Sequence, residues 1–98
     1  MTKLITLAEA KERLRIDTDY DDSDIEVLVR SIKGYLSIAT GLDLDKLVID
    51  SDIWAVAREY VLLRLYMDYY GAHTEIDDKR LTQLIKQLQV AALAVDYA

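Results

Sequence analysis

The sequence predicts an all-α fold, with one short and three long helices in a single small bundle domain. Apolar residues recur at helical spacing over most of the 98 residues. The chain contains no proline, and Gly41 and Gly71 each follow a long helical pattern, where a left-handed C-terminal cap is expected. Hydrophobic residues make up 52% of the chain, which suits one modest core, and we treat residues 1–98 as one domain.

The first predicted helix is short and begins after Thr6. Thr6 and Glu9 have the spacing of a capping box, in which each side chain accepts from the other residue's backbone amide. Leu7, Ala10 and Leu14 then share one face, and the pattern ends near Arg15.

The second predicted helix covers residues 24 to 40 and ends at Gly41. Ser23 and Glu26 form a second capping-box pattern, and Asp24 lies in the first turn, where the helix dipole favours negative charge. The apolar residues at helical spacing are Ile25, Leu28, Val29, Ile32, Leu36 and Ala39.

The third predicted helix is capped by Asp50 or Ser51 and continues to about Tyr70, before Gly71. It is apolar on more than one face, so it is either the central helix of the bundle or a helix that meets a partner chain. The last predicted helix starts near residues 77–78 and keeps its apolar spacing to the end of the chain.

Charge and composition exclude several classes of protein. Without cysteine the chain has no disulfide, no thiolate nucleophile and no cysteine-ligated zinc. The net charge of −6 argues against a nucleic-acid partner, because Lys and Arg supply most of that affinity. Residues 17–26 alone carry six acids and no base. The first residues do not resemble a signal peptide and no segment is apolar enough to span a membrane, so we expect a soluble, cytosolic protein.

No catalytic or metal-binding constellation is visible. Asp17, Asp19 and Asp21 match positions 1, 3 and 5 of a calcium-binding EF-hand loop, but the required glycine and final glutamate are replaced by Asp22 and Leu28. A solvated acidic turn is the interpretation we prefer. His73 is the single histidine and has no cysteine or second histidine to complete a zinc site. We therefore expect no enzyme activity, no metal and no cofactor.

Two segments are candidate contacts with a partner protein. Five of residues 42–49 are apolar and follow no helical or strand period, and they either plug the end of the bundle or form a contact surface. The C-terminal residues stay apolar where chain ends are usually polar. The predicted partner-contact residues are Leu42, Leu44, Leu47, Val48, Ile49, Leu93, Val95 and Tyr97. Tyr66, Tyr69 and Tyr70 lie either at an interface or at the edge of the core.

The order of these motifs resembles the bacteriophage head–tail connector family, whose members are also described as DNA-packaging proteins. The matching pieces are the opening LITLAEAKERLRID of residues 4–17, the acidic run of residues 19–24, the Thr40–Gly41 helix end and the Tyr69–Gly71 helix end. The resemblance covers essentially the whole chain. It departs at residues 42–45, where family members often have Arg after the Thr-Gly pair.

The resemblance implies a structural adaptor that forms a closed, dodecamer-like ring beneath the portal of a tailed phage or prophage. Such a ring extends the DNA channel after packaging and docks the stopper or tail. The implied partners are the portal protein, the stopper or tail protein and further copies of the chain, while genomic DNA passes without specific binding. The implied location is the head–tail junction of the virion, after the bacterial cytoplasm, with no membrane, cofactor or catalysis.

Two alternatives stay open. One is a small DNA-binding regulator of helix–turn–helix type, for which the late basic cluster is Lys79, Arg80 and Lys86 beside Asp77 and Asp78. The other is a hydrolase or metal enzyme that uses the acidic loop.

Overall fold

The computed structural model describes residues 4–95 and 97. Over these residues the chain forms four α-helices and no strand, which confirms the all-α prediction. The elements are α1 (Leu7–Leu14), α2 (Asp22–Thr40), the short 3-10 helix η1 (Leu44–Lys46), α3 (Asp52–Tyr70) and α4 (Glu75–Ala92).

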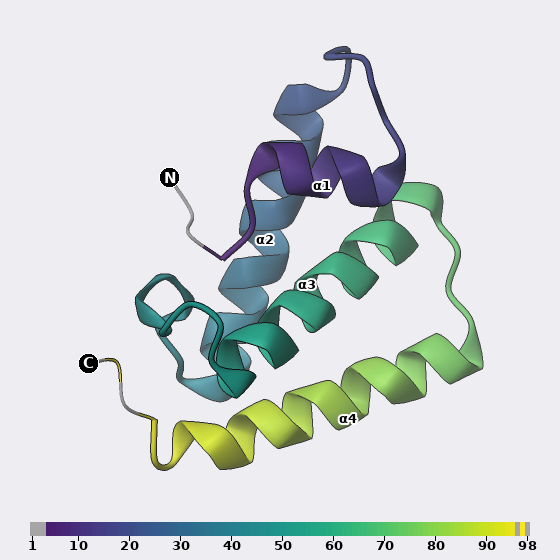
Figure 1. Ribbon diagram of the computed structural model, residues 1–98. Helices are drawn as coiled ribbons and strands as arrows, with labels where there is room; N and C mark the ends of the chain where they lie inside the picture. The colour runs from purple at the N-terminus through teal and green to yellow at the C-terminus, as the bar shows by residue number, and fades with distance from the viewer. Residues whose placement is uncertain (1–3, 96, 98) are drawn as a thin grey trace.

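α3 is the central helix of the bundle, which is one of the two alternatives that its sequence predicts. It packs against the other three helices, with α4 running antiparallel along it and α2 on another side (Figure 1). α1 lies across α2 and α3. Because α3 is covered from several directions, its apolar residues are distributed around the helix instead of along one stripe.

One core joins all four helices with η1 and the segment before α1. Its fully buried large side chains come from every part of the described chain and include Leu4, Leu14, Ile25, Leu36, Leu42, Tyr60, Leu65, Met67, Leu84 and Leu88. Among the described residues no charged or polar side chain is buried to the same degree.

The ends of α1 and α3 agree with their sequence signals. Thr6 and Glu9 form both bonds of the capping box, with the Glu9 amide donating to Thr6 Oγ1 at 3.1 Å. Ser51 caps α3 by accepting from the Trp54 amide at 3.3 Å, and Gly71 ends α3 in the left-handed conformation with φ of 65°.

The predicted start of α2 is wrong by about one half-turn. α2 begins at Asp22, so Ser23 lies inside the helix instead of capping it. The residue at the cap position, Asp21, makes no side-chain bond to the helix, because its Oδ2 accepts a hydrogen bond of 2.7 Å from the Tyr69 hydroxyl.

The predicted bounds of α4 are also wrong. α4 begins at Glu75, where the Thr74 hydroxyl accepts from the Asp77 amide at 3.1 Å. It ends at Ala92, followed by a turn at Leu93 and Ala94, instead of continuing to the end of the chain. The last part of the predicted helix includes residues 96 and 98, which lie outside the described residues.

Candidate protein-contact surface

The two segments that were predicted to contact a partner lie together at one end of the bundle. The Asp43 amide donates to the Tyr97 hydroxyl at 2.9 Å, which joins the loop after α2 to the segment after α4. Nearby, Gln89 Nε2 donates to the Ala39 carbonyl at 3.0 Å, so the C-terminal ends of α4 and α2 are also linked. Figure 1 shows the C-terminal segment beside the loop that carries η1.

Three of the predicted contact residues are in the core. Leu42, Leu44 and Leu47 are 1%, 4% and 6% exposed, so the contact-surface prediction does not hold for these side chains. They plug the end of the bundle, which was the other role that their pattern allowed. Lys33 Nζ lies 2.7 Å from Asp45 Oδ1 and thereby ties η1 to α2, which holds the leucines inward.

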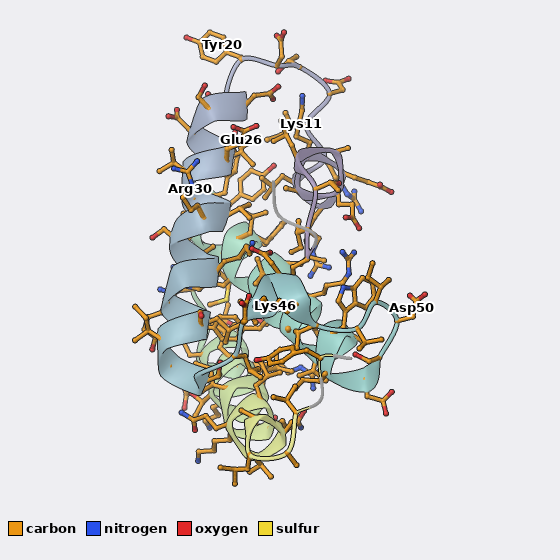
Figure 2. The ribbon with its side chains drawn as sticks, turned by 90° about the vertical axis from the view of Figure 1, so that its left-hand side faces the viewer. Lys11, Tyr20, Glu26, Arg30, Lys46 and Asp50 are labelled. Atoms are coloured by element: carbon orange, nitrogen blue, oxygen red, sulfur yellow. The ribbon has the colours of Figure 1, made fainter. Side chains whose placement is uncertain are left out.

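Four of the five remaining predicted residues are exposed. Val48, Ile49, Leu93 and Tyr97 are 41%, 59%, 87% and 37% exposed, and we call these four the loop–tail surface. Val95 is half-buried and packs against the core. Asp50, exposed beside Ile49, adopts a left-handed conformation with φ of 67° that turns the chain into α3, and it projects from the loop in Figure 2.

The tyrosine cluster at the end of α3 anchors the segment between α1 and α2. The Tyr70 hydroxyl donates to the Leu14 carbonyl, and the Tyr69 hydroxyl donates to Asp21. The hydrogen bond to the Asp21 carboxylate raises the pKa of Tyr69. The ring centroids of Tyr66 and Tyr70 are 5.0 Å apart, and those of Tyr69 and Tyr70 are 4.9 Å apart. These contacts place the tyrosines at the edge of the core, where Tyr66 and Tyr70 stay about half-exposed.

The acidic loop contributes carboxylates to the fold. Lys11 Nζ lies 2.8 Å from Asp22 Oδ1, while Leu28, at the twelfth position of the EF-hand pattern, packs against the core. Among residues 4–95 and 97, no group of three or more His, Asp or Glu side chains is arranged to hold a metal ion. Tyr20 stands at the tip of this loop and is 92% exposed, pointing away from the bundle in Figure 2.

Polar groups with catalytic potential are also in structural roles. His73 Nε2 lies 3.2 Å from Asp68 Oδ1, and the same carboxylate accepts from Arg64 Nε. Ser37 Oγ donates to the Leu42 carbonyl at 2.7 Å, and Ser51 caps α3. These hydrogen bonds connect serine with backbone and histidine with carboxylate, so no described serine is bonded to a histidine that could act as its base.

Arg58 is the residue whose role the sequence did not suggest. Its Nη1 donates to the Leu4 carbonyl at 2.6 Å, and its Nη2 donates to Glu9 Oε2 at 2.5 Å. The guanidinium also lies 4.7 Å from the centre of the Trp54 ring. The hydrogen bond from Arg58 lowers the pKa of Glu9. Arg58 therefore joins α3 to α1 and to the segment before it, through partners about 50 residues away in the sequence.

Two clefts flank α1, and each has an ion pair among its lining residues. A cleft of about 800 Å³ lies between α1 and α3, where Arg13, Arg58, Tyr66 and Tyr70 are among its lining residues. A cleft of about 520 Å³ lies between α1 and α2, with Ile5 and Val29 among its lining residues and Lys33 and Asp45 paired beside them.

Within the part of the chain that the structure describes, no helix is both long and apolar enough to cross a membrane. Comparisons with models of known protein families, with curated proteins and with solved structures give no match for this chain. The resemblance to head–tail connectors therefore depends on the sequence motifs alone.

Proposed function

We propose that this chain is a head–tail connector of a tailed bacteriophage or prophage, an adaptor that forms a ring beneath the portal. The observation that carries the proposal is the order of the motifs, from the opening segment of residues 4–17 to the helix end at residues 69–71. The fold is compatible with it, because the matching segments Thr40–Gly41 and Tyr69–Gly71 lie at the ends of α2 and α3.

In this proposal the loop–tail surface is the docking site for the portal or for the stopper. It offers exposed apolar side chains from two segments, which one hydrogen bond joins, from the Asp43 amide to the Tyr97 hydroxyl. Apolar side chains with a fixed arrangement supply the binding energy of a stable protein contact, whereas flexible ones would first have to be ordered. The net charge of −6 supports passage of DNA through the ring without adhesion.

The DNA-binding alternative has less support. α3 and α4 are joined by a short loop at residues 71–74, as a helix–turn–helix requires. However, Lys79 Nζ lies 3.3 Å from Glu75, and Arg80 pairs with Glu59. A phosphate would have to compete with these carboxylates for both cations.

The test is assembly with any portal protein that the same genome encodes. We expect electron microscopy of the mixture to show a ring of this protein on the portal. Ile49→Asp and Leu93→Asp should abolish binding while the helix content by circular dichroism stays unchanged. The matched control is Ile76→Asp, since Ile76 is 81% exposed near the start of α4 and lies outside the loop–tail surface.

Two outcomes would count against this proposal. Failure of the wild-type protein to bind the portal would overturn the connector function itself. Equal loss of binding in Ile76→Asp and Leu93→Asp would overturn the assignment to the loop–tail surface. A shift of labelled DNA in a low-salt gel assay would instead favour the DNA-binding regulator.

A further inference from the structure

Acidic side chains surround the apolar residues of the loop–tail surface. Residues 42–53, which include its loop side, contain four aspartates and a single base, Lys46. Residues 87–95, which lead into its tail side, carry no charge. Charges at the edge of an apolar contact surface favour partners of the opposite sign, so this sequence bias bears on what the surface binds.

Two of the four carboxylates are paired with lysines. Lys33 Nζ lies 2.7 Å from Asp45 Oδ1, and Lys46 Nζ lies 3.8 Å from Asp43 Oδ2. Asp50 and Asp52 are exposed and make no ion pair with any described side chain. The loop therefore keeps an excess of two negative charges after its lysine partners are counted.

The two unpaired carboxylates follow Ile49, the more exposed apolar side chain of the loop. Asp50 has a left-handed backbone, with φ of 67°, and projects from the loop in Figure 2. Asp52 lies in the first turn of α3, where the helix dipole favours its charged form. Asp43 lies next to the tail, because its amide donates to the Tyr97 hydroxyl. We call Asp43, Asp50 and Asp52 the acidic border.

We propose that the loop–tail surface binds a portal surface on which lysine or arginine side chains border an apolar patch. This inference rests on the connector function and names the chemistry of the portal surface that the chain recognises. Ile49 and Leu93 supply the apolar centre of the contact, and the acidic border attracts the cations around it. Two copies of this chain would not pair through the same surface, because their acidic borders would repel each other.

Charges at the edge of an interface act mainly on the rate of association, because their attraction begins before the proteins touch. Binding to a portal protein of the same genome is therefore measured by stopped-flow fluorescence at about 50 and 500 mM sodium chloride. The wild-type protein should associate about three to ten times more slowly at the higher salt concentration, with little change in the dissociation rate.

Single substitutions in the acidic border should reproduce part of this effect. Asp50→Asn and Asp52→Asn should each slow association about two- to fivefold at low salt, and the difference from wild type should shrink at high salt. Asparagine tolerates the left-handed conformation at position 50, so the loop keeps its shape. Asp50→Lys should slow association more than Asp50→Asn, because it places a cation against the basic border of the portal.

Asp24→Asn is the matched control. Asp24 is also an exposed acid in the first turn of a helix, and its substitution removes the same charge. The first turn of α2 lies at the other end of the bundle from η1 (Figure 1), so the association rate should stay close to that of wild type. All variants are compared after circular dichroism has shown equal helix content.

The outcomes separate this inference from the connector function. A wild-type protein that binds no portal would overturn both. A wild-type protein that binds the portal at the same rate at both salt concentrations would overturn the basic border alone. So would equal slowing by Asp24→Asn and Asp50→Asn, or faster association of Asp50→Lys, which would indicate an acidic portal surface.

Discussion

Replacing Arg58 with methionine should strongly destabilise the fold, although the side chain lies near the surface. The substitution removes the hydrogen bond to the Leu4 carbonyl, which as a bond from a charged group contributes about 1.5–3 kcal/mol. It also removes the Glu9 ion pair, about 0.2–1 kcal/mol after solvent screening, since the Glu9 side chain is 39% exposed. Contact with the Trp54 ring adds about 0.5–1 kcal/mol. Methionine recovers some packing, so we expect a loss of about 2–4 kcal/mol.

The loss is measured by urea unfolding followed by circular dichroism, and it corresponds to a decrease in Tm of roughly 10–25 °C for a chain of this length. Arg80→Met is the matched control, because Arg80 pairs with Glu59 where both side chains are about half-exposed, and it should cost less than about 1 kcal/mol. A loss below about 0.5 kcal/mol in Arg58→Met would refute the anchoring role.

The Arg58 contribution should also depend on pH. The pKa of Glu9 is lowered in the folded protein, chiefly by the hydrogen bond from Arg58. A lowered carboxyl pKa gives stability that is present above the unfolded value of 4.5 and is lost as the pH falls through the folded value. The difference between wild type and Arg58→Met should therefore decrease below pH 4.5 but persist in part, because the bond to the Leu4 carbonyl does not titrate.

Three further predictions concern single side chains. Leu47→Ala should lower the free energy of unfolding by about 2–5 kcal/mol in urea, because the side chain is buried. Ile49→Ala, at 59% exposure, should change the free energy of unfolding by less than about 0.5 kcal/mol. Similar losses in the two variants would contradict the different burial of the two side chains. Tyr69→Phe should lower the urea midpoint at neutral pH. This deficit should disappear as the pH rises above 10.0, because the bond to Asp21 raises the pKa of Tyr69 and stabilises the neutral phenol; a pH-independent deficit would argue against that bond. Gly34→Ala should raise the free energy of unfolding by about 0.5–1 kcal/mol, because Gly34 lies inside α2 and an added Cβ would meet no atom within 4 Å; a decrease would reveal a contact within the chain.

The sequence predicts the end of a helix correctly where the residues that cap it lie within a few positions of each other. The capping box of Thr6 and Glu9 connects residues three positions apart, and the structure contains both of its bonds. The start of α2 was not predictable in this way, because the carboxylate of Asp21 is bound by Tyr69, 48 residues further along the chain. The start of α4 also has a local signal, since Thr74 precedes Asp77 with capping spacing.

The candidate contact residues show a second limit of prediction from the sequence. The segment of residues 42–49 has no helical or strand period, so its sequence does not indicate which side chains point inward. η1 and the ion pair between Lys33 and Asp45 decide this, and they turn Leu44 inward while Ile49 stays exposed. Proximity of the two predicted segments likewise depends on the bundle, which brings Tyr97 to the Asp43 amide.

Residues of the opening motif, 4–17, make contacts within the chain, and this limits what the family resemblance says about a partner. Several of its most distinctive residues have roles in folding: Glu9 caps α1 and binds Arg58, Lys11 pairs with Asp22, and Arg15 ends α1 in a left-handed conformation. A motif whose residues are occupied within the chain indicates a shared fold more directly than a shared partner. The partner must therefore be sought at side chains that the fold does not use. In this chain those include the exposed side chains of the loop–tail surface, and substitutions there should separate binding from stability.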